Sequence, residues 1–257
     1  MDLRLSGKVA VITGASRGIG RAIAETLAAE GMRLVLAARS GEQLDALAKS
    51  LPTETLVRVT DLREPDAPAA VIADALERFQ QLDLLVNNAG ATARGDFLKL
   101  TDDQWEDGFA LKFYGAMRAA RAAWPHLQAS GGAIINIVGV GGRTPSADFA
   151  IGGAVNAALL NLTKALAERG VRDGVRVNAV NPGATATERL QTRLERYASE
   201  HGVERDEAAR RMSHALGVAR FGEPSEIARA VAFLASPQAA FCQGAILDVD
   251  GGQTRTL

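Results

Sequence analysis

Three glycines, Gly14, Gly18 and Gly20, are spaced through the segment TGASRGIG in a pattern that suits the binding of phosphate. Glycine has no side chain to hold backbone N–H groups away from an anion, and the start of a helix attracts negative charge. The segment therefore predicts a site for the pyrophosphate of a dinucleotide, to which three further residues of the turn contribute: Ser16, Arg17 and Ile19. The alternative is a tight turn that binds no ligand.

The predicted elements on either side of this turn, a strand before it and a helix after it, would fix its position. An apolar run from Lys8 to Thr13 predicts a buried parallel strand, and an amphipathic helix from Gly18 to Glu30 follows it. The alternation continues, with further strands predicted at Leu34 to Ala38, Leu56 to Val59, Leu84 to Asn87, Ala133 to Val138, Val175 to Val180 and Ala245 to Val249. We expect a single-domain α/β fold over residues 1–257: a Rossmann-type, doubly wound, seven-stranded parallel sheet with helices on both faces.

Composition argues against several kinds of partner. The 257 residues include 29 Lys and Arg against 30 Asp and Glu, so no excess of positive charge favours nucleic acid. Cys242 is the lone cysteine, and residues 1–7 hold no apolar leader, so we expect a cytoplasmic protein without a membrane partner. No metal site is predicted, because ligand spacing is lacking around the three histidines His126, His201 and His214.

Two segments at the predicted carboxyl edge of the sheet stand out. A capping-box pattern at Thr101 and Gln104 predicts the start of one long helix that ends near Leu127. The segment from Thr187 to Gly217 breaks the strand–helix alternation and is rich in Glu and Arg. Because ligands of open α/β sheets bind beyond the carboxyl ends of the strands, we predict that residues 187–217 form a substrate lid.

Five segments together resemble the short-chain dehydrogenase/reductase family over nearly the whole chain. They are TGASRGIG, the VTDL segment with Asp61, NNAG at Asn87 to Gly90, NPG at Asn181 to Gly183 with Thr187 beyond it, and DVDGG at Asp248 to Gly252. The resemblance implies a Rossmann-type sheet with NAD(P) along its edge and Asp61 near the adenine. It places Asn88, Ala89 and Gly90 beside the ribose and nicotinamide, and it adds Leu62, Pro182, Gly183 and Thr187 to the cofactor-binding residues.

The choice of nucleotide depends on the end of the second predicted strand. An acidic residue there would bind the ribose hydroxyls of NAD, whereas an arginine accommodates the 2′-phosphate of NADP. Arg39 follows this strand, and Arg17 lies in the glycine turn within reach of the same group. NADP(H) is therefore favoured over NAD(H), with a solvated surface charge as the alternative interpretation of Arg39.

Members of the resembled family use a Tyr-x-x-x-Lys pair, a serine after the fifth strand and an asparagine on the preceding helix. At these positions the chain has Gly152, Asn156, Gly139 and Lys112, respectively. The only tyrosines, Tyr114 and Tyr197, are not followed by lysine four residues later, so a shifted alignment does not restore the pair. Loss of a general acid costs about 10²- to 10⁴-fold in rate, so the usual mechanism should fail.

Lysine and asparagine nevertheless appear with their places exchanged, so a cation and an amide are predicted to share one corner of the site. We hypothesise that Lys112 takes over part of the catalytic role beside Asn156, with Asp148 as a further candidate acid or base. A lysine directed at solvent or into an ion pair is the alternative. Gly139 and Gly152 predict an open space beside the nicotinamide for a bulky substrate or water, with close helix packing as the alternative.

These observations predict an NADP(H)-dependent oxidoreductase with a rebuilt active site, which transfers hydride to a bulky carbonyl or conjugated acceptor. Two alternatives stay open: a catalytically inactive nucleotide-binding sensor or scaffold, and a non-redox enzyme that uses the same pocket. We expect a small-molecule substrate. We also expect a homodimer or homotetramer, paired through the long helices that end near Leu127 and Glu168.

Overall fold

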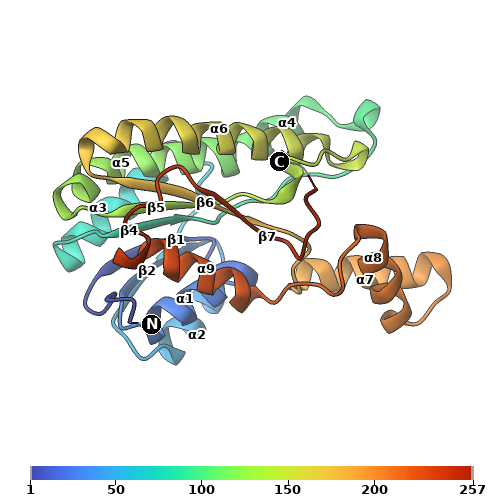
Figure 1. The fold of residues 1–257 in the computed structure, drawn as a ribbon, viewed down its shortest axis with the longest axis horizontal. Coiled ribbons are helices and arrows are strands. Elements are labelled where there is room, and N and C mark those ends of the chain that lie inside the picture. Colours follow the sequence, from blue (N-terminus) through green and yellow to red (C-terminus); the bar gives the residue numbers. More distant parts are fainter. Residues whose placement is uncertain (1, 256–257) are drawn as a thin grey trace.

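A computed structural model of the chain describes residues 2–255. Within them, one sheet of seven parallel strands has the order β3-β2-β1-β4-β5-β6-β7, which confirms the predicted doubly wound fold. Figure 1 shows the sheet in the middle of the molecule, with its strands pointing toward the same edge. The strands are β1 (Val9–Thr13), β2 (Arg33–Ala38), β3 (Thr55–Val59), β4 (Leu84–Asn87), β5 (Ala133–Ile137), β6 (Arg176–Pro182) and β7 (Ile246–Val249).

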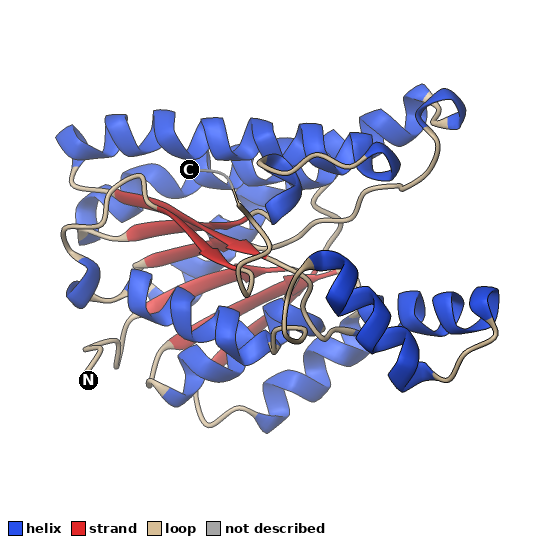
Figure 2. Cartoon of the chain, turned by 45° about the vertical axis from the view of Figure 1, so that its right-hand side comes forward, coloured by secondary structure: helices blue, strands red, loops and turns tan. Residues whose placement is uncertain are grey.

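Helices cover both faces of this sheet (Figure 2). One face carries α1 (Gly18–Ala29), α2 (Gly41–Ser50) and α9 (Pro224–Ala235), and the other carries α3 (Ala67–Phe79), α5 (Gly115–Ser130) and α6 (Ala150–Asp173). The central strands are apolar throughout because alternate residues enter different cores. Ala10 and Ile12 of β1 pack in the first core, and Val9 and Val11 pack in the second.

The strand order creates the place where a ligand is expected. From β1 the chain first builds outward to β2 and β3, and it then returns to place β4 on the other side of β1. At such a switch point the loops that follow β1 and β4 diverge, which leaves a crevice at the carboxyl edge of the sheet. The glycine turn follows β1 and the NNAG segment spans the end of β4, so both lie at this crevice.

The helix expected from Thr101 to about Leu127 is interrupted. The structure has α4 (Asp102–Phe109), a π-helical turn (Ala110–Tyr114) and then α5, which ends at Ser130. The capping box between Thr101 and Gln104 is confirmed. A π-helical turn inserts an extra residue into the helix and often occurs at functional sites, but it leaves no mark in the hydrophobic pattern. The inserted turn contains Lys112.

Helix α6 is apolar, and one of its faces covers the sheet. The helical stretch Ala147–Asp173 is long and apolar enough to cross a membrane, with a mean hydropathy of 1.3 in its most apolar window. In the fold, however, this helix lies along one face of the sheet beside α5 (Figure 1), and Ile151, Val155 and Leu159 are buried in that layer. The core of the domain therefore explains part of the apolar composition of α6, of whose most apolar window 39% is buried.

The segment between β6 and α9 forms a separate helical pair, α7 (Glu188–His201) and α8 (Arg205–Leu216), which projects beyond the end of β7 (Figure 1). The pair has a small apolar cluster of its own, built on Leu190, Leu194 and Ala208. Its two ends are tied together, because the Ala186 amide donates to Gly222 O at 2.8 Å and the Gly222 amide donates to Ala184 O at 2.9 Å. The predicted lid of residues 187–217 thus coincides with a small helical unit on a closed base.

Candidate functional site

The turn after β1 and the loop after β4 are bonded to each other. Thr13 Oγ1 accepts hydrogen bonds from the Asn88 amide at 2.9 Å and the Ala89 amide at 3.1 Å. The Asn88 side chain donates to Thr13 O at 3.0 Å and to Gly14 O at 3.1 Å. Gly14 has φ +66°, and a Cβ there would lie 2.9 Å from Ala89 Cα. Only glycine fits between the two loops.

The N-terminus of α1 is open to an anion. Arg17 is its N-cap residue and makes no side-chain capping bond, and the first turn contains no acidic residue. The first-turn amides of a helix have no partner within the helix, so those that follow Arg17 can bind a phosphate oxygen. A Cβ on Gly18, which has φ +57°, would lie 3.3 Å from Thr187 Cγ2, and one on Gly20 would overlap Gly14 O at 2.1 Å. This geometry fits a dinucleotide pyrophosphate.

The predicted residues of the nucleotide site share the carboxyl edge of the sheet. Pro182 ends β6, and Thr187 is the N-cap residue of α7. The Gly183 amide donates to Val249 O at 3.1 Å, and a Cβ on Gly183 would lie 2.7 Å from Asp250 Cα. Arg17 pairs with Glu188 at 3.6 Å, which links the glycine turn to the base of the helical pair. The edge therefore brings together residues from the loops after β1, β6 and β7.

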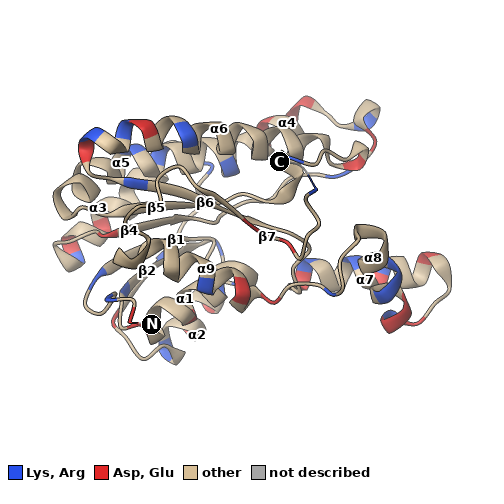
Figure 3. Ribbon diagram, in the orientation of Figure 1, with Lys and Arg blue, Asp and Glu red and all other residues tan. Residues whose placement is uncertain are grey.

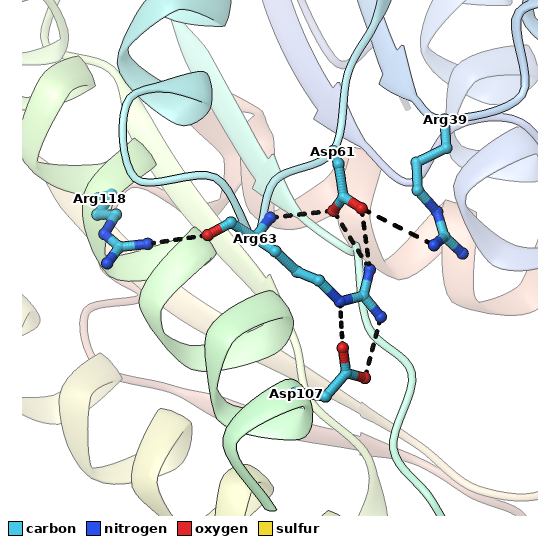
Figure 4. Close-up of polar contacts among 5 residues, drawn as sticks. All are labelled: Arg39, Asp61, Arg63, Asp107 and Arg118. Atoms are coloured by element: carbon cyan, nitrogen blue, oxygen red, sulfur yellow. Dashed lines mark hydrogen bonds and ion pairs between the residues drawn. The ribbon is translucent and has the colours of Figure 1, made fainter. Parts of the chain in front are cut away.

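A cluster of charges surrounds Asp61, which follows β3 at this edge (Figure 4). Arg63 Nη1 lies 3.2 Å from Asp61 Oδ1, and its Nη2 donates to Asp107 Oδ2 at 3.0 Å. The hydrogen bond to Asp107 raises the pKa of Arg63, and Arg63 in turn lowers the pKa of Asp107. Arg39 approaches Asp61 only to 3.9 Å, and its side chain is 62% exposed. Leu62, by contrast, is buried at 5% exposure and packs in the second core.

Lys112 and Asn156 meet just beyond the end of β5. Lys112 Nζ donates to Asn156 Oδ1 at 2.6 Å and also to the backbone carbonyl of Val138. Asn156 is buried and donates through Nδ2 to Gly139 O at 3.3 Å. Burial, and then the nearby charge of Arg189, lower the pKa of Lys112 to about 7. The predicted sharing of one corner by a cation and an amide is confirmed, and the solvent-directed alternative for Lys112 is wrong.

A chain of hydrogen bonds fixes the end of β5 below this corner. The Gly139 amide donates to Asn181 Oδ1 at 2.9 Å, and Asn181 Nδ2 donates to Asp248 Oδ1 at 2.7 Å. Arg143 completes the chain through an ion pair with Asp248 at 2.7 Å. The hydrogen bonds among β5, β6 and β7 therefore fix the carbonyls of Val138 and Gly139. These carbonyls hold Lys112 and Asn156 in position before a substrate binds.

The open space expected beside Gly152 is filled, so that prediction is wrong. A Cβ on Gly152 would lie 2.0 Å from Phe149 Cζ, and one on Gly141 would lie 3.0 Å from the same ring. A Cβ on Gly139 would meet Asn156 Nδ2 at 3.2 Å. The Phe149 ring and the Asn156 amide occupy the volume that side chains at residues 152 and 139 would need. This is expected because protein interiors leave few voids. Close packing, the alternative interpretation of these glycines, is what the structure has.

Asp148 lies apart from the corner that Lys112 and Asn156 form. Its carboxylate accepts hydrogen bonds from Ser146 Oγ and from Arg94 Nη1, the latter at 3.0 Å. These two partners lower the pKa of Asp148, with the Ser146 bond as the largest cause. An exposed carboxylate held in its charged form is a poor proton donor near neutral pH. Asp148 is instead part of the polar rim, where Arg94 also lies 3.8 Å above the Phe149 ring.

Sequence reasoning missed two residues that the fold brings to the site, Phe149 and Arg189. Arg189 reaches across from the first turn of α7, and its Nη2 donates to Gly90 O at 3.1 Å. A Cβ on Gly90 would lie 2.9 Å from Lys112 Cδ, so Arg189 reaches the strand end beside the lysine. In the sequence, only the position of Arg189, two residues after Thr187, indicates that it lies near the site.

Comparison with known proteins agrees with this architecture. The family model described as enoyl-(acyl carrier protein) reductase matches residues 14–254. The chain is 39% identical to galactitol 2-dehydrogenase (L-tagatose-forming) of Cereibacter sphaeroides, over 98% of this chain and 96% of that protein.

Two solved structures show the same similarity. L-sorbose reductase of Gluconobacter frateurii, complexed with NADPH and L-sorbose, superposes with a TM-score of 0.95 at 33% identity and full coverage of both chains. The 3-ketoacyl-(acyl-carrier-protein) reductase of Brucella melitensis, complexed with NADH, gives a TM-score of 0.86 at 29% identity, over 97% of this chain and 99% of that one. The chain therefore belongs to the short-chain dehydrogenase/reductase family of oxidoreductases.

Proposed function

We propose that the protein is an NADP(H)-dependent oxidoreductase in which Lys112 exchanges the proton with the oxygen of a carbonyl or conjugated acceptor. The observation that carries this proposal is the position of Lys112 Nζ, bonded to Asn156 Oδ1 and Val138 O at the carboxyl edge of the sheet. The family residues expected at this corner are replaced by Gly139 and Gly152, so Lys112 is the proton donor that the corner offers.

The hydrogen bonds of Lys112 leave one proton for a substrate. A charged lysine has three N–H donors, and two of them are taken by Asn156 and Val138. The third can be donated to an oxygen that develops negative charge, after which the neutral amine keeps both protein contacts. A pKa of about 7 suits this exchange, because both protonation states are populated near neutral pH. A bound nicotinamide would supply or remove the hydride.

Asn156 holds the amine in place rather than exchanging a proton itself. It accepts from Lys112 through Oδ1 and donates to Gly139 O through Nδ2, so both ends of its amide are used. The chain of bonds through Asn181 and Asp248 keeps that strand end fixed. We therefore assign Lys112 the catalytic role and Asn156 a positioning role.

Arg39 supports the preference for NADP(H). Arg63 is engaged by both Asp61 and Asp107, so Asp61 already has a close cationic partner. Arg39 remains mostly exposed, with a weak contact at 3.9 Å that a 2′-phosphate could replace. Among the related structures, the sorbose reductase binds NADPH and the ketoacyl reductase binds NADH, so the choice rests on Arg39 of this chain.

The helical pair of residues 187–217 is proposed to act as the lid over this corner. Arg189 at its start already bonds to Gly90 O, and Thr187 adjoins Gly18 in the glycine turn. Closure of α7 toward β4 would exclude water from the reacting atoms. We also propose a cytoplasmic homodimer or homotetramer paired through α5 and α6, which sedimentation analysis would test.

The test of the function compares wild type with Lys112→Met in NADPH oxidation. Probe acceptors are 4-nitrobenzaldehyde as a simple carbonyl and 9,10-phenanthrenequinone as a conjugated one. We expect kcat to fall by about 10²- to 10⁴-fold with 4-nitrobenzaldehyde. The dissociation constant for NADPH should change little. In wild type, the reduction rate should fall as pH rises through about 7, because the charged amine is the donor.

Lys49→Met is the matched control, because Lys49 is exposed in the last turn of α2, outside the site. Equal rates in wild type and Lys112→Met would overturn the role of Lys112. NADPH binding with no oxidation by either acceptor would overturn the proposed hydride transfer to simple aldehydes and quinones.

A further inference from the structure

Positive charge collects above the Lys112 corner from three separate segments of the chain. Lys112 comes from the π-helical turn, Arg94 from the loop after β4, and Arg189 and Arg193 from α7. The spacing of four places Arg189 and Arg193 on one face of α7. Figure 3 shows that α7 and α8 carry both signs of charge, so this local excess is not a property of the whole helical pair.

Contacts link Arg189 to the neighbourhood of Lys112 and Arg94 to the Phe149 ring, and helix geometry places Arg193 next to Arg189. Arg189 bonds to Gly90 O at 3.1 Å, next to the stem of Lys112. Arg94 lies over the Phe149 ring, and the same ring packs against Gly152. Arg193 lies one turn beyond Arg189. Burial, followed by the charge of Arg94, lowers the pKa of Arg193, whereas Asp148 raises it.

The carboxylates near these cations are already engaged. Asp148 pairs with Arg94 at 3.0 Å and also bonds to Ser146, and Glu188 pairs with Arg17 at 3.6 Å. Within residues 2–255, the ion pairs of the structure include none for Lys112, Arg189 or Arg193. Arg189 and Arg193 are exposed side chains of like charge, and the pKa of Arg189 is lowered by partial burial and then by the charges of Arg17 and Arg94. A bound anion would relieve the repulsion between such like charges.

We propose that the substrate of this oxidoreductase carries an acidic group, which Arg189 and Arg193 bind while Lys112 contacts the reacting oxygen. The inference rests on the proposed function and adds the class of substrate: an oxo acid or hydroxy acid. A guanidinium binds a carboxylate through paired, charge-assisted hydrogen bonds, and a second guanidinium one helical turn away fixes its orientation. The relatives named for galactitol and L-sorbose act on uncharged sugars, which gives the test a natural contrast.

The experiment uses the full chain saturated with NADP⁺ or NADPH. Matched pairs of acid and methyl ester serve as probes: 4-oxopentanoate, phenylglyoxylate and 2-oxohexanoate, with L-sorbose as an uncharged ketose. Calorimetric titration of the NADP⁺ complex measures binding without turnover, and NADPH oxidation measures reduction. We expect one or more of the acids to bind about 10- to 100-fold more tightly than its ester. Arg193→Gln and Arg189→Gln should each remove most of that preference.

Arg196→Gln is the matched control, because Arg196 lies further along the same helix, is 79% exposed and already pairs with Glu200. It should leave the acid preference unchanged. Esters or L-sorbose that bind as tightly as every acid would overturn the inference, as would an acid preference that survives in Arg193→Gln.

The combination of binding and turnover distinguishes failure of the anion site from failure of hydride transfer. If Arg193→Gln weakens NADP⁺ as strongly as it weakens the acid, the arginines serve cofactor phosphates and the inference is wrong. If the acid preference depends on Arg193 but no probe oxidises NADPH, the anion site stands and the proposed hydride transfer fails. If esters and acids are reduced equally well, hydride transfer stands and the anion site fails.

Discussion

Replacement of Lys112 by methionine should change how the stability of the protein depends on pH, independently of any substrate. Methionine has a similar length and no amine, so it keeps the packing of the stem while removing the charge. The change leaves Asn156 Oδ1 and Val138 O without their lysine donor. An unsatisfied buried acceptor costs about 1–3 kcal/mol at any pH, so the diagnostic quantity is the pH dependence rather than the absolute loss.

The sign and size of this dependence follow from the pKa of Lys112. Burial lowers that pKa from 10.5 to about 7, so between these values the folded chain binds fewer protons than the unfolded chain. Stability therefore rises with pH in this window, by about 1.4 kcal/mol per pH unit once the folded amine is neutral. From pH 7 to 9 the wild type should gain roughly 2 kcal/mol relative to Lys112→Met, within an upper limit of about 5 kcal/mol for the whole window.

Urea unfolding of both proteins at pH 6, 7, 8 and 9 measures this difference, because other titrating groups are common to both chains. The free energies of unfolding should run parallel below pH 7 and separate above it, with the wild type gaining. The Lys49→Met control should follow the wild type throughout. Parallel curves from pH 6 to 9 would show that Lys112 is solvated and would refute the reasoning.

Three further predictions concern the nucleotide site and the filled corner. Arg39→Asp should weaken NADPH binding by at least about tenfold and favour NADH, as measured by calorimetry; an unchanged preference would contradict the role of Arg39. Gly18→Ala should weaken both nucleotides and cost about 1 kcal/mol of stability, because residue 18 has φ +57°. Gly152→Ala should destabilise wild type by about 1–3 kcal/mol through overlap with Phe149, yet stabilise the Phe149→Ala variant by about 1 kcal/mol. Additive effects in that double-mutant cycle would show that the ring is not the obstacle.

The sequence predicted the fold and the nucleotide edge because their signals are local. Buried parallel strands appear as short apolar runs, and Gly14, Gly18 and Gly20 mark a turn whose conformation and close contacts exclude side chains. The contact between Lys112 and Asn156 was also predictable, because the two residue types appear with their places exchanged at positions that the family brings together.

The errors arose where one residue depends on a distant one. The loss of a side chain at Gly152 predicts empty space, but the ring that fills it comes from a loop with no periodic signal. The π-helical turn around Lys112 adds a residue without altering the apolar pattern, so the pattern predicts a continuous helix. Arg189 resembles the other exposed arginines of its segment, and only the fold shows that it reaches Gly90.

The two ends of the α7–α8 segment lie side by side, so the segment could be exchanged as a unit by protein engineering. Its ends meet through the pairing of Ala186 and Gly222, and its apolar contacts are largely its own. A replacement of residues 187–221 with the equivalent segment of a sugar dehydrogenase would leave the seven strands and their register untouched. Chimeras joined at these ends would therefore exchange the proposed lid as a unit, together with Thr187 and Glu188 beside the glycine turn, while the glycine turn and the NNAG segment are inherited from the parent.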